Sequence, residues 1–232
     1  MQGISMRLKT MAEYIQQGAT LADIGTDHAY LPLYAVTNDL VQKVIAGEVN
    51  QGPYLRAKAH IEQHRLSHLI DVRLGDGLDV VARGEVTTVT IAGMGGSLMV
   101  DILQAGLDKL QGVKRLILQP MGSEAYLREW LHRHNYRIVA EKILKEQDII
   151  YEIIVADYGQ PLDALTSIEL QFGPFLLREK NQAFMEKWDG ELQKKQRIFQ
   201  NIVTNSISDS AEGKKSQLLV EIQRIKDVLS HA

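Results

Sequence analysis

The chain has 232 residues, of which 45% are hydrophobic and 24% charged, and its net charge is −3. This length accommodates one globular domain, or one domain with an appendage, and the slightly negative charge excludes a globally basic nucleic-acid binder, although charge can still gather on one face. The absence of cysteine excludes disulfides, thiolate metal sites and cysteine nucleophiles. We expect no metal site. No segment is apolar for long enough to be a signal peptide or a membrane span, so the expected location is the cytoplasm.

The first 160 residues alternate between strand and helix patterns. Helical periodicity covers about 8–18, 30–38, 53–63, 98–110 and 125–134. Strand patterns cover about 20–24, 44–48, 70–74, 86–92 and 115–118, and 137–144 and 149–156 read as a hairpin. Five β–α units followed by a hairpin predict an α/β fold with a seven-stranded, doubly wound, Rossmann-like sheet.

The pattern changes near residue 160. Residues 174–205 and 211–229 show two long helical patterns, separated by a polar break at 206–210. We therefore predict two domains, 1–160 and 161–232, the second being a C-terminal helical coiled-coil hairpin. The alternative is that these helices simply pack on the sheet domain.

The loop after the first strand carries two carboxylates, Asp23 and Asp27, on either side of Gly25. A dinucleotide-binding loop needs a second glycine where this chain has Asp27, because the backbone must approach a pyrophosphate there. An acidic loop suits a ligand that carries an ammonium and a sulfonium. The sequence therefore favours S-adenosylmethionine as the cofactor.

Three further strand ends carry residues suited to this cofactor. Glu48 can accept hydrogen bonds from both ribose hydroxyls, Asp76 can accept from the adenine amino group, and Met94 can pack on the ring. Each of these residues alone could be a helix cap or a loop residue. Because they lie in order at four strand ends, we predict that the cofactor contacts Asp23, Gly25, Asp27, Glu48, Asn50, Asp76, Gly77, Gly93 and Met94.

The substrate signal is weaker. A locally basic stretch could contact phosphates, or could be an ordinary solvated face because glutamates are interleaved; its members are Arg128, His132, Arg133, His134, Arg137, Lys142 and Lys145. Residues 92–96 lack the Asp/Asn-Pro-Pro-aromatic motif that many amino-group methyltransferases of bases carry after the fourth strand. Without that motif or a cysteine, a ring nitrogen with a free lone pair is the favoured methyl acceptor.

Several strings resemble the bacterial tRNA (adenine-N1)-methyltransferases of the TrmK family. They are Ala22-Asp-Ile-Gly-Thr-Asp-His-Ala-Tyr-Leu31, Gly47-Glu-Val-Asn-Gln-Gly52, Arg73-Leu-Gly-Asp-Gly-Leu78, Ile91-Ala-Gly-Met-Gly-Gly96 and Leu118-Gln-Pro-Met121. The resemblance implies a class I methyltransferase fold with a C-terminal coiled-coil domain, an S-adenosylmethionine cofactor and a tRNA substrate modified at adenine 22 of the D-loop. It also implies cofactor contacts at Asp23, Gly25, Glu48, Asn50, Asp76, Gly77 and Gly93.

These observations predict an enzyme that methylates N1 of an adenine in tRNA and acts as a monomer. Asp27 and His28 are the candidate catalytic residues, because they would lie beside the methyl donor and could hold the adenine and stabilise its developing positive charge. The alternatives are a methyltransferase for a small molecule or a protein, and a non-catalytic module that binds S-adenosylmethionine. Asp27 disfavours an NAD-linked oxidoreductase.

Overall fold

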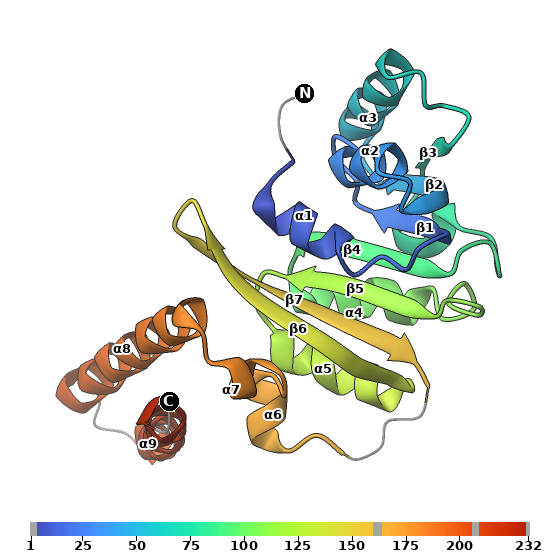
Figure 1. Cartoon of the computed structure of the whole chain (residues 1–232). Coiled ribbons are helices and arrows are strands. Elements are labelled where there is room, and N and C mark those ends of the chain that lie inside the picture. Colours follow the sequence, from blue (N-terminus) through green and yellow to red (C-terminus); the bar gives the residue numbers. More distant parts are fainter. Residues whose placement is uncertain (1–3, 160–163, 206–208, 231–232) are drawn as a thin grey trace.

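The protein contains one seven-stranded sheet with the strand order β3-β2-β1-β4-β5-β7-β6 (Figure 1). The structure, a computed structural model, describes residues 4–159, 164–205 and 209–230. The strands are β1 Ala19–Ile24, β2 Val41–Glu48, β3 Ile70–Leu74, β4 Thr88–Met94, β5 Arg115–Pro120, β6 Tyr136–Glu146 and β7 Ile149–Tyr158. The predicted seven-stranded, doubly wound sheet is confirmed.

The sheet is parallel except at β7, which pairs antiparallel with both β5 and β6. Gln147 and Asp148 join β6 to β7, and both have positive φ angles, 49° and 64°, as a two-residue type I′ hairpin turn requires. The carboxyl ends of the parallel strands β1 to β5 consequently meet at one edge of the sheet.

Helices cover both faces of the sheet, as expected for strands that are buried on both sides (Figure 1). On one face, α1 Met6–Ala12, α2 Tyr30–Thr37 and α3 Gln51–Gln63 pack on a core that includes Met11, Leu21 and Val44. On the other face, the 3-10 helix η1 Gly77–Val80, α4 Gly96–Ala105 and α5 Glu124–Arg133 pack on a core that includes Ile91 and Leu103. In the described part of the chain, no helix has both the length and the apolar content needed to cross a membrane.

The C-terminal part is more divided than the sequence predicts. It contains α6 Ser167–Phe172, α7 Leu176–Glu179, α8 Gln182–Asn205 and α9 Asp209–Ser230. The expected single helix over 174–205 is wrong, because Lys180 takes a left-handed conformation with φ 39° and Asn181 Oδ1 accepts a hydrogen bond from the Phe184 N–H at 3.1 Å, which starts a new helix. The predicted domain boundary at 160 and most of the predicted break at 206–210 lie outside the described residues.

The two long helices form a pair whose base packs on the sheet domain. Phe172, Phe184, Trp188 and Ile225 form a third core with Ile143 of β6. Beyond this core, an ion pair of 2.6 Å between Lys195 and Glu221 joins α8 to α9. The α8–α9 pair extends away from the sheet (Figure 1).

A buried charge cluster lies where the helical pair meets the sheet. The Arg128 guanidinium is fully buried and donates to Glu141 at 2.7 Å and to Glu152 at 2.8 Å. From α8, Lys187 Nζ contacts Glu124 at 2.7 Å and the other oxygen of Glu152 at 2.8 Å. Arg128 therefore belongs to an internal network that joins α5, β6, β7 and α8, and its predicted place in a phosphate-contacting patch is wrong.

Other members of the predicted basic stretch are also separated. Lys142 and Lys145 form ion pairs with Glu179 of α7 and Glu186 of α8. His134 stacks on Trp130 with ring centroids 4.1 Å apart. The stretch is thus not one patch, because several of its cations hold the helical part of the chain in place.

Replacing Arg128 by methionine should lower the free energy of unfolding by about 3–5 kcal/mol, because Glu141 and Glu152 would be left without the guanidinium that offsets their burial. Urea titration measures this change. The control is Arg133→Ala on the same helix, whose 70% exposed side chain pairs with Glu129 and should contribute less than about 0.5 kcal/mol. A decrease below about 1 kcal/mol for Arg128→Met would contradict the structural role of the cluster.

Candidate active site

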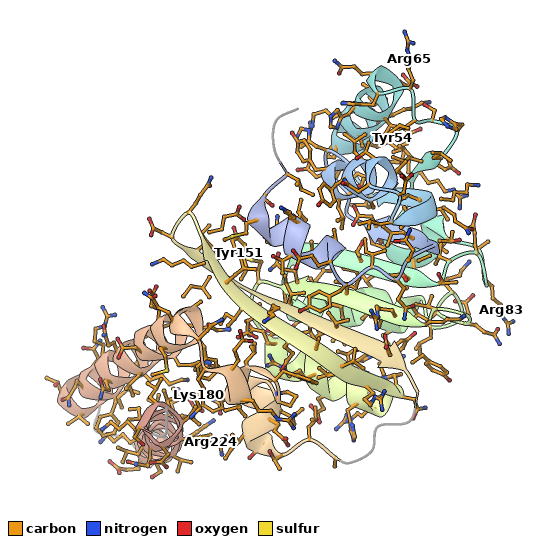
Figure 2. The ribbon with its side chains drawn as sticks, in the orientation of Figure 1. Tyr54, Arg65, Arg83, Tyr151, Lys180 and Arg224 are labelled. Atoms are coloured by element: carbon orange, nitrogen blue, oxygen red, sulfur yellow. The ribbon has the colours of Figure 1, made fainter. Side chains whose placement is uncertain are left out.

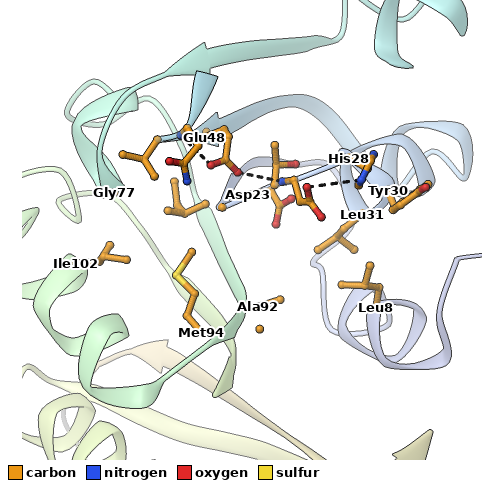
Figure 3. Close-up of a pocket in the computed structure, with 18 of the residues that line it drawn as sticks. Leu8, Asp23, His28, Tyr30, Leu31, Glu48, Gly77, Ala92, Met94 and Ile102 are labelled. Atoms are coloured by element: carbon orange, nitrogen blue, oxygen red, sulfur yellow. Dashed lines mark hydrogen bonds and ion pairs between the residues drawn. The ribbon is translucent and has the colours of Figure 1, made fainter. Parts of the chain in front are cut away.

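The carboxyl ends of β1, β2, β3 and β4 open into a cavity of about 960 Å³ (Figure 3). Helix α1 and the start of α4 provide its other walls. All of the sequence-predicted site residues line this one cavity: Asp23, Gly25, Asp27, His28, Glu48, Asn50, Asp76, Gly77, Gly93 and Met94. Four separate strand ends therefore contribute to a single site, as the parallel topology requires.

The loop after β1 has a conformation that depends on Gly25. Its φ of 73° is one that other residues rarely adopt, and a Cβ atom there would lie 2.2 Å from the Met94 Cε atom. The N–H groups of Gly25 and Thr26 both donate to the Gly47 carbonyl, at 2.9 and 3.0 Å. The loop is thereby held against the end of β2, and Met94 closes one side of it.

Glu48 is a buried carboxylate that joins two loops. Its Oε2 atom accepts a hydrogen bond from the Asp27 N–H at 3.3 Å, and its Oε1 atom accepts one from the Asn50 N–H at 3.0 Å. A carboxylate has about four acceptor positions, so each oxygen can still accept a second donor from a ligand. This residue can therefore bind a pair of hydroxyl groups while keeping both loops in place.

Asp23 lies at the buried end of the cavity. Its Oδ1 atom accepts a hydrogen bond from the Thr90 hydroxyl at 2.7 Å. Burial raises the pKa of Asp23, while the Thr90 hydrogen bond and the Arg7 guanidinium act in the opposite direction. A cationic ligand group at this end would meet a carboxylate with little competing water.

Asp27 and His28 lie at the mouth of the cavity. The Asp27 side chain is 63% exposed, and its Oδ1 atom lies 3.7 Å from His28 Nε2 and 3.6 Å from Arg56 Nη2. The His28 ring stacks on Tyr30, with centroids 5.5 Å apart (Figure 3). A carboxylate, an imidazole and a phenol ring therefore surround the entrance, where a second substrate would approach a bound cofactor.

The wall opposite this acidic loop is apolar. Leu98 and Ile102 of α4 line it together with Met94 (Figure 3). Gly77, with φ 48°, brings its backbone so close to Ile102 that a Cβ atom would lie 3.0 Å from the Ile102 Cγ2 atom. This narrow apolar side, next to Asp76, can hold a flat ring.

The contribution of α1 to the cavity was not predicted from the sequence. Arg7 lines the cavity, and its Nη1 atom donates to Gln119 Oε1 at 2.5 Å, while that oxygen also accepts the Gly93 N–H at 3.1 Å. The Glu146 carboxylate, at the end of β6, accepts the N–H groups of Met6 and Arg7 at 2.6 and 3.2 Å. No local pattern could reveal this, because Gln119 and Glu146 lie 112 and 139 residues from Arg7 in the chain.

The strand order, the antiparallel last pair and the acidic cavity at the strand ends define the class I methyltransferase fold. Within that class, the chain belongs to the TrmK family, described as tRNA (adenine(22)-N(1))-methyltransferase, which matches residues 21–227. The family resemblance seen in the sequence is therefore confirmed.

The similarity to individual members of this family extends over nearly the whole chain. The tRNA (adenine(22)-N(1))-methyltransferase of Bacillus subtilis strain 168 is 45% identical, with 98% of each chain covered. Streptococcus pneumoniae Sp1610, a putative tRNA (m1A22) methyltransferase solved in complex with S-adenosyl-L-methionine, is 42% identical at a TM-score of 0.89, covering 98% of this chain and 100% of that one. Mycoplasma capricolum TrmK, solved with S-adenosyl-homocysteine, is 30% identical at a TM-score of 0.86, with 98% of each chain covered.

Proposed function

We propose that this chain transfers a methyl group from S-adenosylmethionine to N1 of adenine 22 in the tRNA D-loop. The observation that carries the proposal is an acidic strand-end cavity in a chain that is 45% identical, over 98% of its length, to a tRNA (adenine(22)-N(1))-methyltransferase. We further propose that it acts as a monomer in the cytoplasm, where its tRNA substrate is present.

The residues of the cavity fit the three parts of this cofactor. Glu48 would accept from the ribose hydroxyls with the free acceptor positions of its two oxygens. Asp76 would accept from the adenine amino group, with the ring between the backbone of Gly77 and the Met94 side chain. Asp23 would bind the ammonium at the buried end. When bound, S-adenosylmethionine supplies an electrophilic methyl group on a sulfonium.

In this reaction the protein has two tasks: it positions the adenine beside the methyl donor, and it stabilises the positive charge that forms on the ring. The N1 lone pair of adenine attacks the methyl carbon, the carbon–sulfur bond breaks, and no proton leaves N1, so no general base is needed in this step. The adenine must leave its stack to enter the cavity, because N1 is hidden in paired RNA. Asp27 and His28 lie at the entrance, where the carboxylate would stabilise the cationic ring that forms.

Incubation of the full chain with S-adenosylmethionine and unmodified tRNA should place one methyl group on N1 of adenine 22. Mass mapping of nuclease fragments checks the position. A tRNA in which guanosine replaces that adenine is the control and should remain unmodified. Binding of S-adenosylmethionine without any transfer to tRNA would contradict the proposal and favour a small-molecule or protein substrate, or a non-catalytic role.

Asp27→Asn should lower kcat for tRNA about 10- to 1000-fold, because the charge that stabilises the methylated ring is removed. The KM for S-adenosylmethionine should change little, since the side chain is at the mouth of the cavity and the contact with Glu48 is made by the backbone N–H. Asp148→Asn, a 97% exposed position in the hairpin turn, is the matched control. Wild-type turnover in both Asp27→Ala and His28→Ala would remove these residues from the mechanism.

Arg7 and Asp23 together match the amino-acid end of the cofactor. That end carries an ammonium and a carboxylate, and the Arg7 guanidinium lies close enough to Asp23 to oppose the rise in pKa that burial causes. Gln119 fixes Arg7 through one nitrogen, which leaves other guanidinium N–H groups able to donate to a ligand. We therefore assign Arg7 to the methionine carboxylate, with Asp23 on the ammonium.

Decarboxylated S-adenosylmethionine tests the role of Arg7, with affinities measured by calorimetry. The wild-type protein should bind it about 10- to 100-fold more weakly than the natural cofactor, as expected for removal of a charged hydrogen bond. Arg7→Gln should weaken binding of the natural cofactor by a similar factor but leave the decarboxylated form almost unchanged. Lys9→Gln, exposed on the same helix, is the control. An equal decrease in affinity for both compounds would contradict the assignment.

A further inference from the structure

A second hollow lies where the sheet meets the helical part, and the known reaction does not use it. This hollow, the junction groove, has a volume of about 440 Å³ and is formed by the start of β6, the end of α5, and α6 and α7. Arg137 and Arg178 line it together with Tyr136, Phe175 and Glu169. Figure 1 shows α6 and α7 beside β6 and away from α1, the helix whose Arg7 and Leu8 line the cofactor cavity.

Arg137 has no carboxylate partner among the residues that the structure describes. On the neighbouring strand it faces Asp157, whose two oxygens accept from Arg115 at 2.6 and 2.8 Å, and no ion pair between Arg137 and Asp157 forms in the described part of the chain. The Arg137 side chain is exposed. Among the described residues, none occupies its guanidinium, so the N–H donors of Arg137 are open to a ligand.

Arg178 is similarly available. Its guanidinium lies over the Phe175 ring at 5.6 Å, and in the described ranges it forms no ion pair. The adjacent Glu179 is paired with Lys142. Glu169 also lines the groove, and its Oε2 atom accepts from the backbone N–H and the hydroxyl of Thr166, both at 2.9 Å. These hydrogen bonds, and to a smaller extent the charge of Arg178, lower the pKa of Glu169. Two arginines and one ionised glutamate give the groove a charge of +1, in a chain whose net charge is −3.

The groove combines these cations with apolar and aromatic surface. Phe175, Pro174 and Ile138 line it beside the two guanidinium groups. Guanidinium groups bind phosphate oxygens through paired N–H donors, and aromatic rings stack on unpaired bases. This combination matches a nucleotide within an RNA chain better than an isolated anion or an apolar ligand.

The position of the groove favours a large ligand. Strand β6 begins at the groove, and its far end carries Glu146, which holds α1 at the cofactor cavity. Eleven residues of strand span about 35 Å. A folded RNA can occupy both sites at once, whereas a small substrate cannot.

We propose that the junction groove binds the tRNA body, with a backbone phosphate between Arg137 and Arg178 and a base against Phe175. This inference rests on the proposed function, since it needs tRNA as the substrate. It gives the helical part of the chain a defined role, because α6 and α7 complete a binding site that the sheet domain alone would leave half open.

The test is the double variant Arg137→Ala/Arg178→Ala in the full chain, with tRNA affinity measured by fluorescence anisotropy at several salt concentrations. The Kd should rise about tenfold or more, and the slope of log K against log salt should fall by about 0.7–0.9 for each phosphate that the variant no longer neutralises. S-adenosylmethionine affinity and Tm should not change. The KM for tRNA should rise while kcat at saturating tRNA is retained.

Two further variants make the result decisive. Arg83→Ala removes an exposed arginine at the far side of the molecule from α6 and α7 (Figure 2) and should leave tRNA binding unchanged. Arg137→Lys/Arg178→Lys keeps the charges and should recover most of the affinity. If the double alanine variant is unstable, the exposed Arg137→Gln single variant replaces it, with a smaller expected decrease in affinity.

Each outcome has one meaning. The alanine variant could retain wild-type tRNA affinity and salt slope while the wild-type chain methylates tRNA normally. That result would overturn the assignment of the junction groove as a tRNA-binding site and leave the proposed function intact. A wild-type chain that neither binds nor methylates tRNA would overturn the proposed function itself.

Discussion

The cofactor cavity depends on the Glu48 carboxylate. One of its oxygens accepts the Asp27 N–H and the other accepts the Asn50 N–H, so the loops after β1 and β2 are fixed to the same side chain. Because Glu48 is buried, its carboxylate needs these hydrogen-bond donors: an unpaired carboxylate at this place would cost several kcal/mol. A residue assigned to the ribose on chemical grounds is thus also the residue that shapes the loop in front of it. With the proposed ribose contact, ligand binding and loop conformation would both depend on the same carboxylate.

Most of the sheet and the acidic part of the site could be predicted because their determinants are local. Strand patterns, glycines and carboxylates follow one another within about ten residues, as in the segment from Asp23 to Asp27, and parallel strands must end at one edge. The topology then brings Asp23, Glu48 and Asp76 to one cavity without any need to know the side-chain packing. The roles of these residues toward the cofactor stay predictions.

The remaining features could not be predicted because their partners are distant in the chain. Arg128 has the sequence context of a surface helix residue, and only the contacts with Glu141 and Glu152 on two strands show that it is buried. Arg7 likewise becomes part of the cavity through Gln119 and Glu146. The helix break at Lys180 has no glycine or proline to mark it; the residue that starts the next helix is Asn181, whose side chain caps α8 and also donates to the Ile143 carbonyl of β6 at 3.1 Å. Contacts between residues that are distant in the chain thus determine these features, and local periodicity does not.

The contact between Glu146 and the start of α1 links the cavity to a distant part of the sheet. Met11 and Ala12 pack the end of α1 into the core on one face of the sheet, while the Glu146 carboxylate, next to the β6–β7 turn, accepts the N–H groups of Met6 and Arg7 at the start of the helix. The helix is therefore attached at both ends, by apolar packing at one end and by a carboxylate at the other. The hairpin that closes the sheet thereby also sets the place of Arg7 in the cavity wall, so a change in the hairpin would alter the cavity without touching any residue that lines it.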